Sequence, residues 1–261
     1  MKRLIINADD FGFTSDVNAG IVHAHREGVL TSATLMANGN AFDDAVRLSR
    51  ETPTLDIGCH LVLVQGRSLL TGRPLPEGPR DLLFMLARRQ IDVYAELRAQ
   101  MEAILSSGIR PTHLDSHKHT HIVPGIFRQV VRLAREFSVP YVRLPLDETV
   151  PLARLPCAFA GRYYRRIASA SAVQMTDHFL GFRLTGSLDE RTFAAALQSV
   201  REGATELMCH PGYLGPELAH APTRLKESRV HELEALTSPR IRELIAAQRI
   251  QLSPFEDANS Y

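Results

Sequence analysis

The densest group of side chains that could do chemistry lies in residues 113–121, where histidines and one aspartate recur at every second position. These residues are His113, Asp115, His117, His119 and His121. The chain has 11 histidines in 261 residues, so an even spread would place fewer than one in this window. Alternate residues of an extended chain share one face, and imidazole with carboxylate suits Zn, Fe, Mn or, with more oxygen ligands, Mg. The cluster therefore favours a metal site over a polar surface loop. One ion cannot take all four imidazoles, so two or three are expected to orient ligands or substrate.

Three further segments carry polar side chains at the ends, or in the far halves, of predicted strands. Asp9 and Asp10 follow the first apolar strand, His60 lies in the third, and His210 follows the seventh. In barrels and open α/β sheets the site forms at the carboxyl ends of the strands. Gathering such polar groups there is costly unless they bind something. We therefore expect these residues to meet the 113–121 cluster.

Each of these segments also has a structural interpretation. Asp9 and Asp10 precede Phe-Gly and could form a turn, His60 could be a hydrogen-bonded core histidine, and His210 could cap a turn. Neighbouring residues of a regular strand face opposite ways. One of the two aspartates would then reach a metal ion while the other reaches around the strand end as a base.

Short apolar runs alternate with helical segments along the chain, which is the pattern of parallel strands joined by crossover helices. Strands are expected at residues 4–8, 31–37, 55–64, 111–116, 141–144, 179–182, 206–209 and 250–252. Helices are expected at 16–27, with Ser15 as the N-cap, and at 42–50, 91–107, 124–137, 188–202, 224–236 and 239–248. No linker or repeat interrupts this alternation. Seven or eight βα units therefore predict a single α/β barrel domain over residues 1–261.

Two segments fall outside the alternation. Residues 66–79 are too rich in glycine and proline for a helix or a central strand, and we expect residues 66–90 to form a long loop at the active site. Residues 146–176 show no clear pattern and are treated as an insertion of unassigned role. This insertion contains the basic and aromatic run at 162–166.

Composition excludes several classes of function. Thirty Lys and Arg against 29 Asp and Glu give a formal net charge of +1, so no nucleic-acid partner is expected. The sequence has no stretch of 18 apolar residues, so no membrane span is expected, and carboxylates at residues 9–10 come too early for a secretory leader.

Three cysteines without ligand spacing or a disulfide pattern predict a cytoplasmic enzyme. Cys59 and Cys209 neighbour site residues but face away from them on a strand, which leaves a Cys–His nucleophile as a minor alternative. Motifs of serine hydrolases, P-loop NTPases and dinucleotide-binding folds are absent.

Four segments in order along the chain resemble the signatures of the YdjC-like (ChbG-type) carbohydrate deacetylases. They are Asn-Ala-Asp-Asp-Phe-Gly at residues 7–12, Gly-Cys-His-Leu at 58–61, Thr-His-Leu-Asp-Ser-His-Lys-His-Thr-His at 112–121, and Cys-His-Pro-Gly-Tyr at 209–213. The resemblance spans nearly the whole chain, and four ordered motifs make it far more specific than any one of them.

The resemblance implies a distorted TIM-type barrel that holds one divalent ion, Mg²⁺ or Zn²⁺, and hydrolyses the N-acetyl group of an amino sugar. When the motif positions of the family are transferred to this sequence, the resemblance implies Asp10, His60 and His117 as the metal ligands. Asp9 is then the general base and His210 the acid. The substrate-binding residues expected beside them are Asp115, His119, His121 and Tyr213. The family also implies a homodimer.

The stretch at 61–67 and the arginine-rich middle of the chain look closer to the hopanoid-associated (HpnK-like) branch than to the chitooligosaccharide branch. Lys118 stands where chitobiose-acting members tend to show another histidine. This branch implies an N-acetylglucosaminyl lipid as substrate, with Arg162, Tyr163, Tyr164, Arg165 and Arg166 facing a membrane surface. The alternative for this run is a solvated helix face. The remaining alternatives for the whole chain are another metal-dependent barrel enzyme (isomerase, aldolase or phosphoesterase) and a non-catalytic sugar- or metal-binding protein.

Overall fold

The computed structural model describes residues 1–144, 146 and 154–258, and its centre is a curled parallel sheet. The strands are β1 (Lys2–Phe11), β2 (Ser32–Leu35), β3 (Asp56–Leu61), β4 (His113–Ser116), β5 (Tyr141–Val142), β6 (His178–Leu180), β7 (Gly203–Cys209) and β8 (Ile250–Leu252). Their order is β5-β4-β3-β2-β1-β7-β6, with β8 paired to β1. All these pairs are parallel. The predicted α/β fold with parallel strands is confirmed, and the curled sheet forms a half-barrel consistent with a distorted TIM-type barrel.

The segment before β6 contacts strands near both ends of the sheet. Val142 of β5 donates its backbone N–H to Gln174 O at 3.0 Å. Three residues later, Asp177 donates to Ala204 O of β7 at 2.9 Å. One short stretch of chain therefore hydrogen-bonds to the edge strand β5 and to β7, the neighbour of the other edge strand β6.

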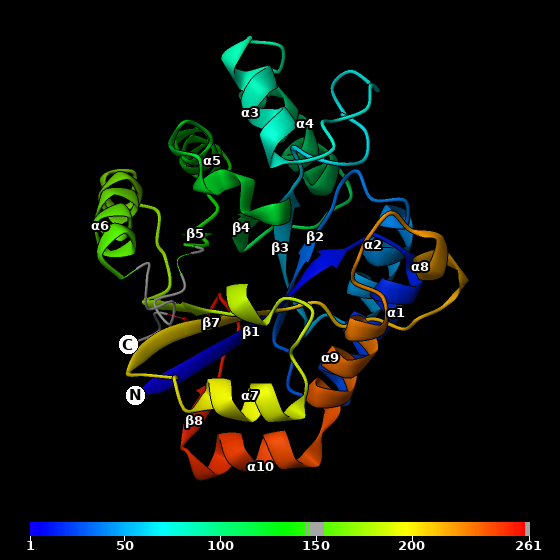
Figure 1. The fold of residues 1–261 in the computed structure, drawn as a ribbon, viewed down its shortest axis with the longest axis vertical. Coiled ribbons are helices and arrows are strands. Elements are labelled where there is room, and N and C mark those ends of the chain that lie inside the picture. The colour runs from blue at the N-terminus through cyan, green and yellow to red at the C-terminus, as the bar shows by residue number, and fades with distance from the viewer. Residues whose placement is uncertain (145, 147–153, 259–261) are drawn as a thin grey trace.

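Helices surround the outside of this sheet (Figure 1). They are α1 (Ser15–Arg26), α2 (Phe42–Glu51), α3 (Pro79–Ala87), α4 (Val93–Ser106), α5 (Pro124–Glu136), α6 (Arg154–Ala170), α7 (Glu190–Leu197), α8 (Pro216–His220), α9 (Glu227–Thr237) and α10 (Pro239–Ala247). Two short 3₁₀ turns, η1 (His117–Ile122) and η3 (Phe182–Leu184), follow β4 and β6. Among the described residues, none of the helices combines the length and the apolar character that a membrane crossing requires.

Local signals explain several helix ends. Thr14 caps α1 by accepting from the Val17 backbone N–H, so the N-cap lies one residue before the predicted Ser15. Pro124 is the first residue of α5. Proline suits this position because it lacks a backbone N–H, and the N–H groups of the first helical turn have no partner within the helix. Asp189 and Thr192 form a reciprocal capping box at the start of α7.

Three sequence expectations are corrected by the structure. The predicted loop 66–90 contains helix α3, since its Pro-Arg-Asp-Leu-Leu-Phe-Met-Leu-Ala sequence lies beyond the last glycine and can propagate a helix. The extended run expected over 113–121 stops at Ser116, and η1 begins at His117. Of the unassigned segment 146–176, residues 154–170 form α6, while 147–153 lie outside the described residues.

Candidate active site

Three potential metal ligands converge where β1, β3 and β4 end. Asp10 Oδ1 lies 3.1 Å from His117 Nδ1 and 3.4 Å from His60 Nε2, and the two ring nitrogens are 3.4 Å apart. All three donor atoms lie within 4.8 Å of one another. Two imidazole nitrogens and a carboxylate oxygen at this spacing fit a divalent cation that completes its coordination with water or substrate.

A backbone irregularity lets the two neighbouring aspartates face the same space. Asp10 has a φ of 69°, in the left-handed region, and the pairing of β1 with β2 shifts register between Ala8 and Phe11. This bulge redirects the side chain that strict alternation would send to the opposite face. The expectation that one aspartate must reach around the strand end is therefore replaced by a bulge at Asp10.

Each candidate ligand is oriented by a second contact. His60 Nδ1 lies 2.7 Å from Asp115 Oδ1, and a proton on Nδ1 would leave Nε2 free for a metal ion. His117 Nε2 lies 3.1 Å from Gln65 Oε1, which likewise leaves Nδ1 facing Asp10. The second oxygen of Asp10 accepts from Arg229. Burial opposes a charge on His60, but Asp115 and Asp10 raise its pKa to about 10.

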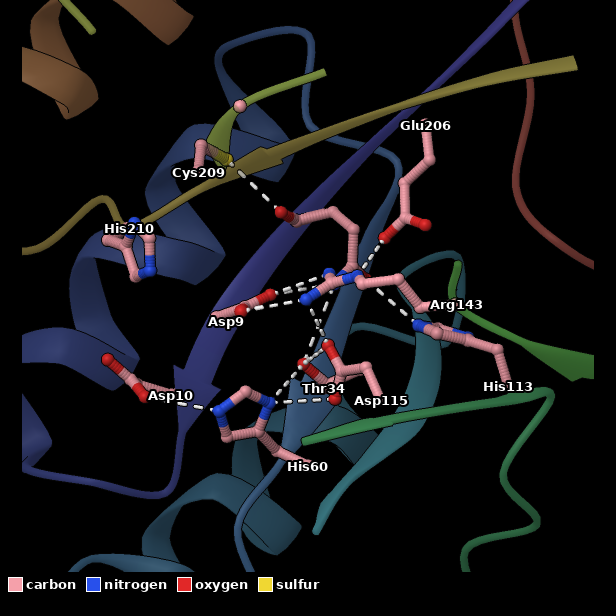
Figure 2. Close-up of polar contacts among 12 residues, drawn as sticks. Asp9, Asp10, Thr34, His60, His113, Asp115, Arg143, Glu206, Cys209 and His210 are labelled. Carbon is pink, nitrogen blue, oxygen red and sulfur yellow. Dashed lines mark hydrogen bonds and ion pairs between the residues drawn. The ribbon is translucent and has the colours of Figure 1, made fainter. Parts of the chain in front are cut away.

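Arg143 lies behind the site and holds three carboxylates (Figure 2). Its Nη atoms contact both oxygens of Asp9 at 2.7 and 2.9 Å, while Nη1 lies 2.7 Å from Asp115 Oδ2. Its Nε donates to Glu206 Oε1 at 2.6 Å. All four side chains are buried. Burial alone would raise the pKa of Asp9, but the guanidinium of Arg143 holds it well below its usual range. Glu206 differs, because burial outweighs Arg143 and raises its pKa to about 7.

His210 lies beside the two aspartates, directly after β7. Its backbone N–H donates to Glu232 Oε2 at 2.5 Å, and its ring Nδ1 is 3.9 Å from the same oxygen. Burial lowers the pKa of His210 to about 4, although Asp9 and Asp10 oppose the shift. Burial also raises the pKa of Glu232 to about 7. The His210 ring and the Glu232 carboxyl group therefore lie next to each other without a direct hydrogen bond, and the ring Nδ1 has no partner among the described residues.

These groups open into a cavity of about 540 Å³. Asp9, Asp10, His60, His117 and His210 contribute its acidic and imidazole groups. Phe182, Met208 and Leu225 supply apolar wall, and Lys118 and Arg224 lie at the exposed side. A cavity with polar groups gathered on one part of an otherwise mixed wall is the usual form of a small-molecule site.

The chain matches the profile of the family described as YdjC-like protein over residues 3–247. This chain belongs to the YdjC-like family. A protein of Brevibacillus brevis named carbohydrate deacetylase is 36% identical to this YdjC-like protein over 98% of this chain and 99% of its own length. A carbohydrate deacetylase of Geobacillus stearothermophilus is 35% identical over 98% of each chain. A crystal structure from Enterococcus faecalis, provisionally named a cellobiose-phosphate cleavage protein, superposes with a TM-score of 0.81 at 28% identity and covers 98% of each chain.

The structure of this YdjC-like protein brings most of the predicted site residues together, but not all of them. His119 lines the cavity beside Phe182, and its ring Nδ1 has no hydrogen-bond partner among the described residues. Asp115 and His121 are buried behind the cavity, where His121 Nε2 contacts Arg143 O. Tyr213 lies outside the cavity against His23 of α1. The structure therefore places Asp115 and His121 as supports of site residues and leaves Tyr213 away from them.

Sequence reasoning missed the charged residues that hold this site. Arg143 and Glu206 lie in or beside buried apolar strands, and a charge in such a strand demands a partner, so this signal was present in the sequence. Arg229 and Glu232 lie on helix α9, where charged residues are ordinary, and Gln65 follows β3 in an irregular segment. For these three, the sequence carries no signal that separates them from surface residues.

Proposed function

We propose that this protein is a divalent-metal-dependent deacetylase that hydrolyses the N-acetyl group of an N-acetylglucosamine-containing substrate. The observation that carries the proposal is the donor set of Asp10, His60 and His117, which opens into one cavity together with Asp9 and His210. Relatives at 35–36% identity named carbohydrate deacetylase support the same reaction. Mg²⁺ and Zn²⁺ are the two candidate ions.

Amide hydrolysis requires that a water oxygen bonds to the acetyl carbon, the C–N bond breaks, and the amine nitrogen takes a proton. When bound, a divalent ion supplies positive charge that lowers the pKa of water and polarises a carbonyl. Asp9 is the base that accepts the water proton. Arg143 keeps the Asp9 carboxylate ionised and fixes both of its oxygens in place. Asp9 is therefore ready to accept a proton at neutral pH, although its low pKa makes it a weaker base than an ordinary carboxylate.

His210 is the group that donates a proton to the departing amine. Burial lowers the pKa of His210 to about 4, so the ring is neutral at pH 7 and must take up a proton before it donates one. Once formed, its imidazolium is a stronger acid than an ordinary one. Glu232, 3.9 Å from its Nδ1 and with a pKa raised to about 7, is placed to hold a proton nearby at neutral pH. The unpartnered nitrogen of His119 offers a further hydrogen bond to the sugar or its acetyl group.

Acetate release, measured together with metal content, tests this function. We expect the wild-type protein to release acetate from di-N-acetylchitobiose or from a vesicle-borne N-acetylglucosaminyl lipid, and to stop when a chelator removes the metal. The preferred substrate of the two decides between the chitooligosaccharide and the lipid branch.

Two variants distinguish the role of a metal ligand from that of the general base. Asp9→Asn should keep metal and lose most turnover, by about 10²–10⁴-fold as expected for a general base, whereas His117→Ala should lose metal. His220→Ala, a change on the exposed helix α8, should keep both. Equal metal content in wild type and His117→Ala would contradict the ligand assignment. Metal binding without acetate release from either substrate would leave a non-catalytic binding protein.

A further inference from the structure

The segment between β3 and α4 carries an apolar surface that the rest of the described structure leaves uncovered. Leu83 is 49% exposed and Phe84 is 54% exposed on α3, and Leu69 and Leu70 are exposed on the loop before it. Leu82 is the one fully buried residue of this helix. In Figure 1, α3 stands at the outer end of the molecule, beyond α4. Large exposed apolar groups that gather on one segment mark an interaction surface.

The outward face of α3 combines apolar and cationic side chains. Arg80, Phe84 and Arg88 are spaced four residues apart and therefore share one side of the helix, with Leu83 beside them. The guanidinium carbon of Arg88 lies 3.9 Å from the centre of the Phe84 ring. We call these four residues the α3 face.

An apolar groove adjoins the α3 face. It has a volume of about 660 Å³ and lies between α3, the start of α4 and the start of α5. Its apolar lining is Leu83, Leu86, Ile91, Val93, Val123 and Ile126. Leu83 belongs to both features, so the exposed helix face continues into the groove.

The net charge of the segment between β3 and α4 indicates the kind of partner that this surface binds. Residues 62–92 contain five arginines and three carboxylates, so the segment has a formal charge of +2. One of these carboxylates, Asp92, lines the groove together with Arg89. The arginine–carboxylate pairs seen among the described residues are made by other arginines. A twofold contact of this face with a second copy would bring the arginines of both copies together. An anionic surface would satisfy them.

We propose that the α3 face and its groove dock onto an anionic lipid surface. Phe and Leu side chains would enter the boundary between headgroups and acyl chains, while the arginines pair with lipid phosphates, as in other interfacial helices. This location differs from the run at 162–166. There Tyr164 is buried and Arg165 donates to the backbone carbonyls of Thr176 and Asp177, so these two side chains face the protein.

The proposal stands apart from the proposed function, because lipid binding is measured without turnover. The full chain is sedimented with vesicles of phosphatidylcholine alone and with vesicles that also contain phosphatidylglycerol. We expect binding to the anionic vesicles, weakened by added salt, and little binding to the neutral ones. Acetate release from a soluble substrate, run in parallel, reports on the cavity independently.

Two double variants test the two halves of the surface. Leu83→Ser with Phe84→Ser should lower binding to anionic vesicles by about tenfold or more, since both apolar side chains are lost from the interface. Arg80→Gln with Arg88→Gln should lower it by roughly fivefold for each arginine. Leu214→Ser, a change at an exposed leucine in the segment between β7 and α8, is the matched control and should bind as wild type does.

Three outcomes would overturn the proposal. They are no binding to either vesicle, equal binding by wild type and both double variants, and a dimer that the Leu83→Ser, Phe84→Ser variant dissociates. The last result, read from sedimentation equilibrium, would assign the surface to a second copy of this chain.

Discussion

At the scale of single residues, Arg143 determines the geometry of the site. It contacts carboxylates from β1, β4 and β7, and it lies fully buried among them. A buried ion pair adds little stability compared with apolar packing, but removal of one partner leaves uncompensated charge in a medium of low dielectric. Arg143 therefore makes the main contribution to the ionisation of Asp9 and contacts both of its oxygens, while Asn7 donates a further hydrogen bond to Oδ1.

Replacement of this guanidinium should damage stability and catalysis together. We expect Arg143→Gln to lower the free energy of unfolding by about 3–5 kcal/mol and to reduce turnover even when metal is supplied in excess. Urea unfolding followed by circular dichroism, together with acetate release, measures the two effects. Arg47→Gln is the control, because Arg47 makes only exposed pairs with Asp44 and Glu51, which contribute at most about 1 kcal/mol. Arg143→Gln as stable as that control would disprove the role.

Glu206 predicts a pH dependence of stability. Its pKa rises from 4.5 to about 7 because burial disfavours the carboxylate. The folded state thus binds the proton more tightly than the unfolded state, so this contribution is complete below pH 4.5 and is lost as the pH rises through about 7. The Glu206→Gln variant has no titrating group at this position and so does not lose stability in this way. The difference in unfolding free energy, variant minus wild type, should therefore increase with pH across this window, by on the order of 3 kcal/mol. Urea titrations at several pH values would refute this if the difference between the two proteins stayed constant.

At the scale of elements, α1 fixes the loop that carries His210. A Cβ added at Gly20 of α1 would lie 2.5 Å from the Cα of Gly212, two residues after His210. Gly212 also donates its N–H to Arg229 O at 3.2 Å, and Tyr213 donates to Asp16 O of α1 at 3.1 Å. The loop is therefore held between two helices at backbone contact distance.

An added methyl group tests this contact. Gly20→Ala should cost about 1–3 kcal/mol of unfolding free energy, because two backbones must separate, and it should lower turnover while metal content stays unchanged. Thermal unfolding and acetate release are the measurements. Gly125→Ala in α5 has open space around the new Cβ and should be neutral or stabilising by up to about 1 kcal/mol. An equal response of the two variants would show that the contact does not position His210.

The elements also show where sequence reasoning succeeds and where it fails. Asp10, His60 and His210 could be placed because apolar strands are readable and their carboxyl ends share one edge of a parallel sheet. The turn η1 could not be placed, since Lys118 and His119 adopt left-handed conformations with φ of 51° that non-glycine residues rarely adopt. Alternation of polar residues over 113–121 suggested a strand, and tertiary contacts decided otherwise.

Helix α3 and the Arg143 cluster illustrate two further limits. The glycine- and proline-rich start of segment 66–90 led to the prediction of a loop over the whole segment, so the helical run that follows it was not predicted. Arg143 and Glu206 are 63 residues apart in the chain, so only the curled arrangement of the strands shows that they pair with each other. The motifs thus contain the acidic and imidazole residues that face the cavity, and the structure was needed for the residues that hold them.

At the scale of the whole molecule, the candidate metal ligands tie distant parts of the chain together. Asp10 and His117 are 107 residues apart in sequence, and the unfolded chain does not preform their arrangement. A ligand that binds only the folded state raises its stability. Metal should therefore stabilise the whole fold.

Differential scanning calorimetry measures this directly. At about 100 times its Kd, the correct ion should raise the unfolding temperature of wild type by roughly 5–10 °C. His117→Ala should show no such rise, and His220→Ala should respond as wild type does. An equal rise in His117→Ala would mean that the ion binds elsewhere.

The Arg143 cluster also has a consequence for biosynthesis. Its carboxylates come from β1, β4 and β7, and β7 inserts between β6 and β1. A nascent polypeptide cannot complete this cluster until Gly203–Cys209 has been synthesised and has joined the sheet beside β1. Amide-cleaving competence would then require the completed sheet, and truncated fragments that stop before residue 203, which also lack His210, would be chemically silent.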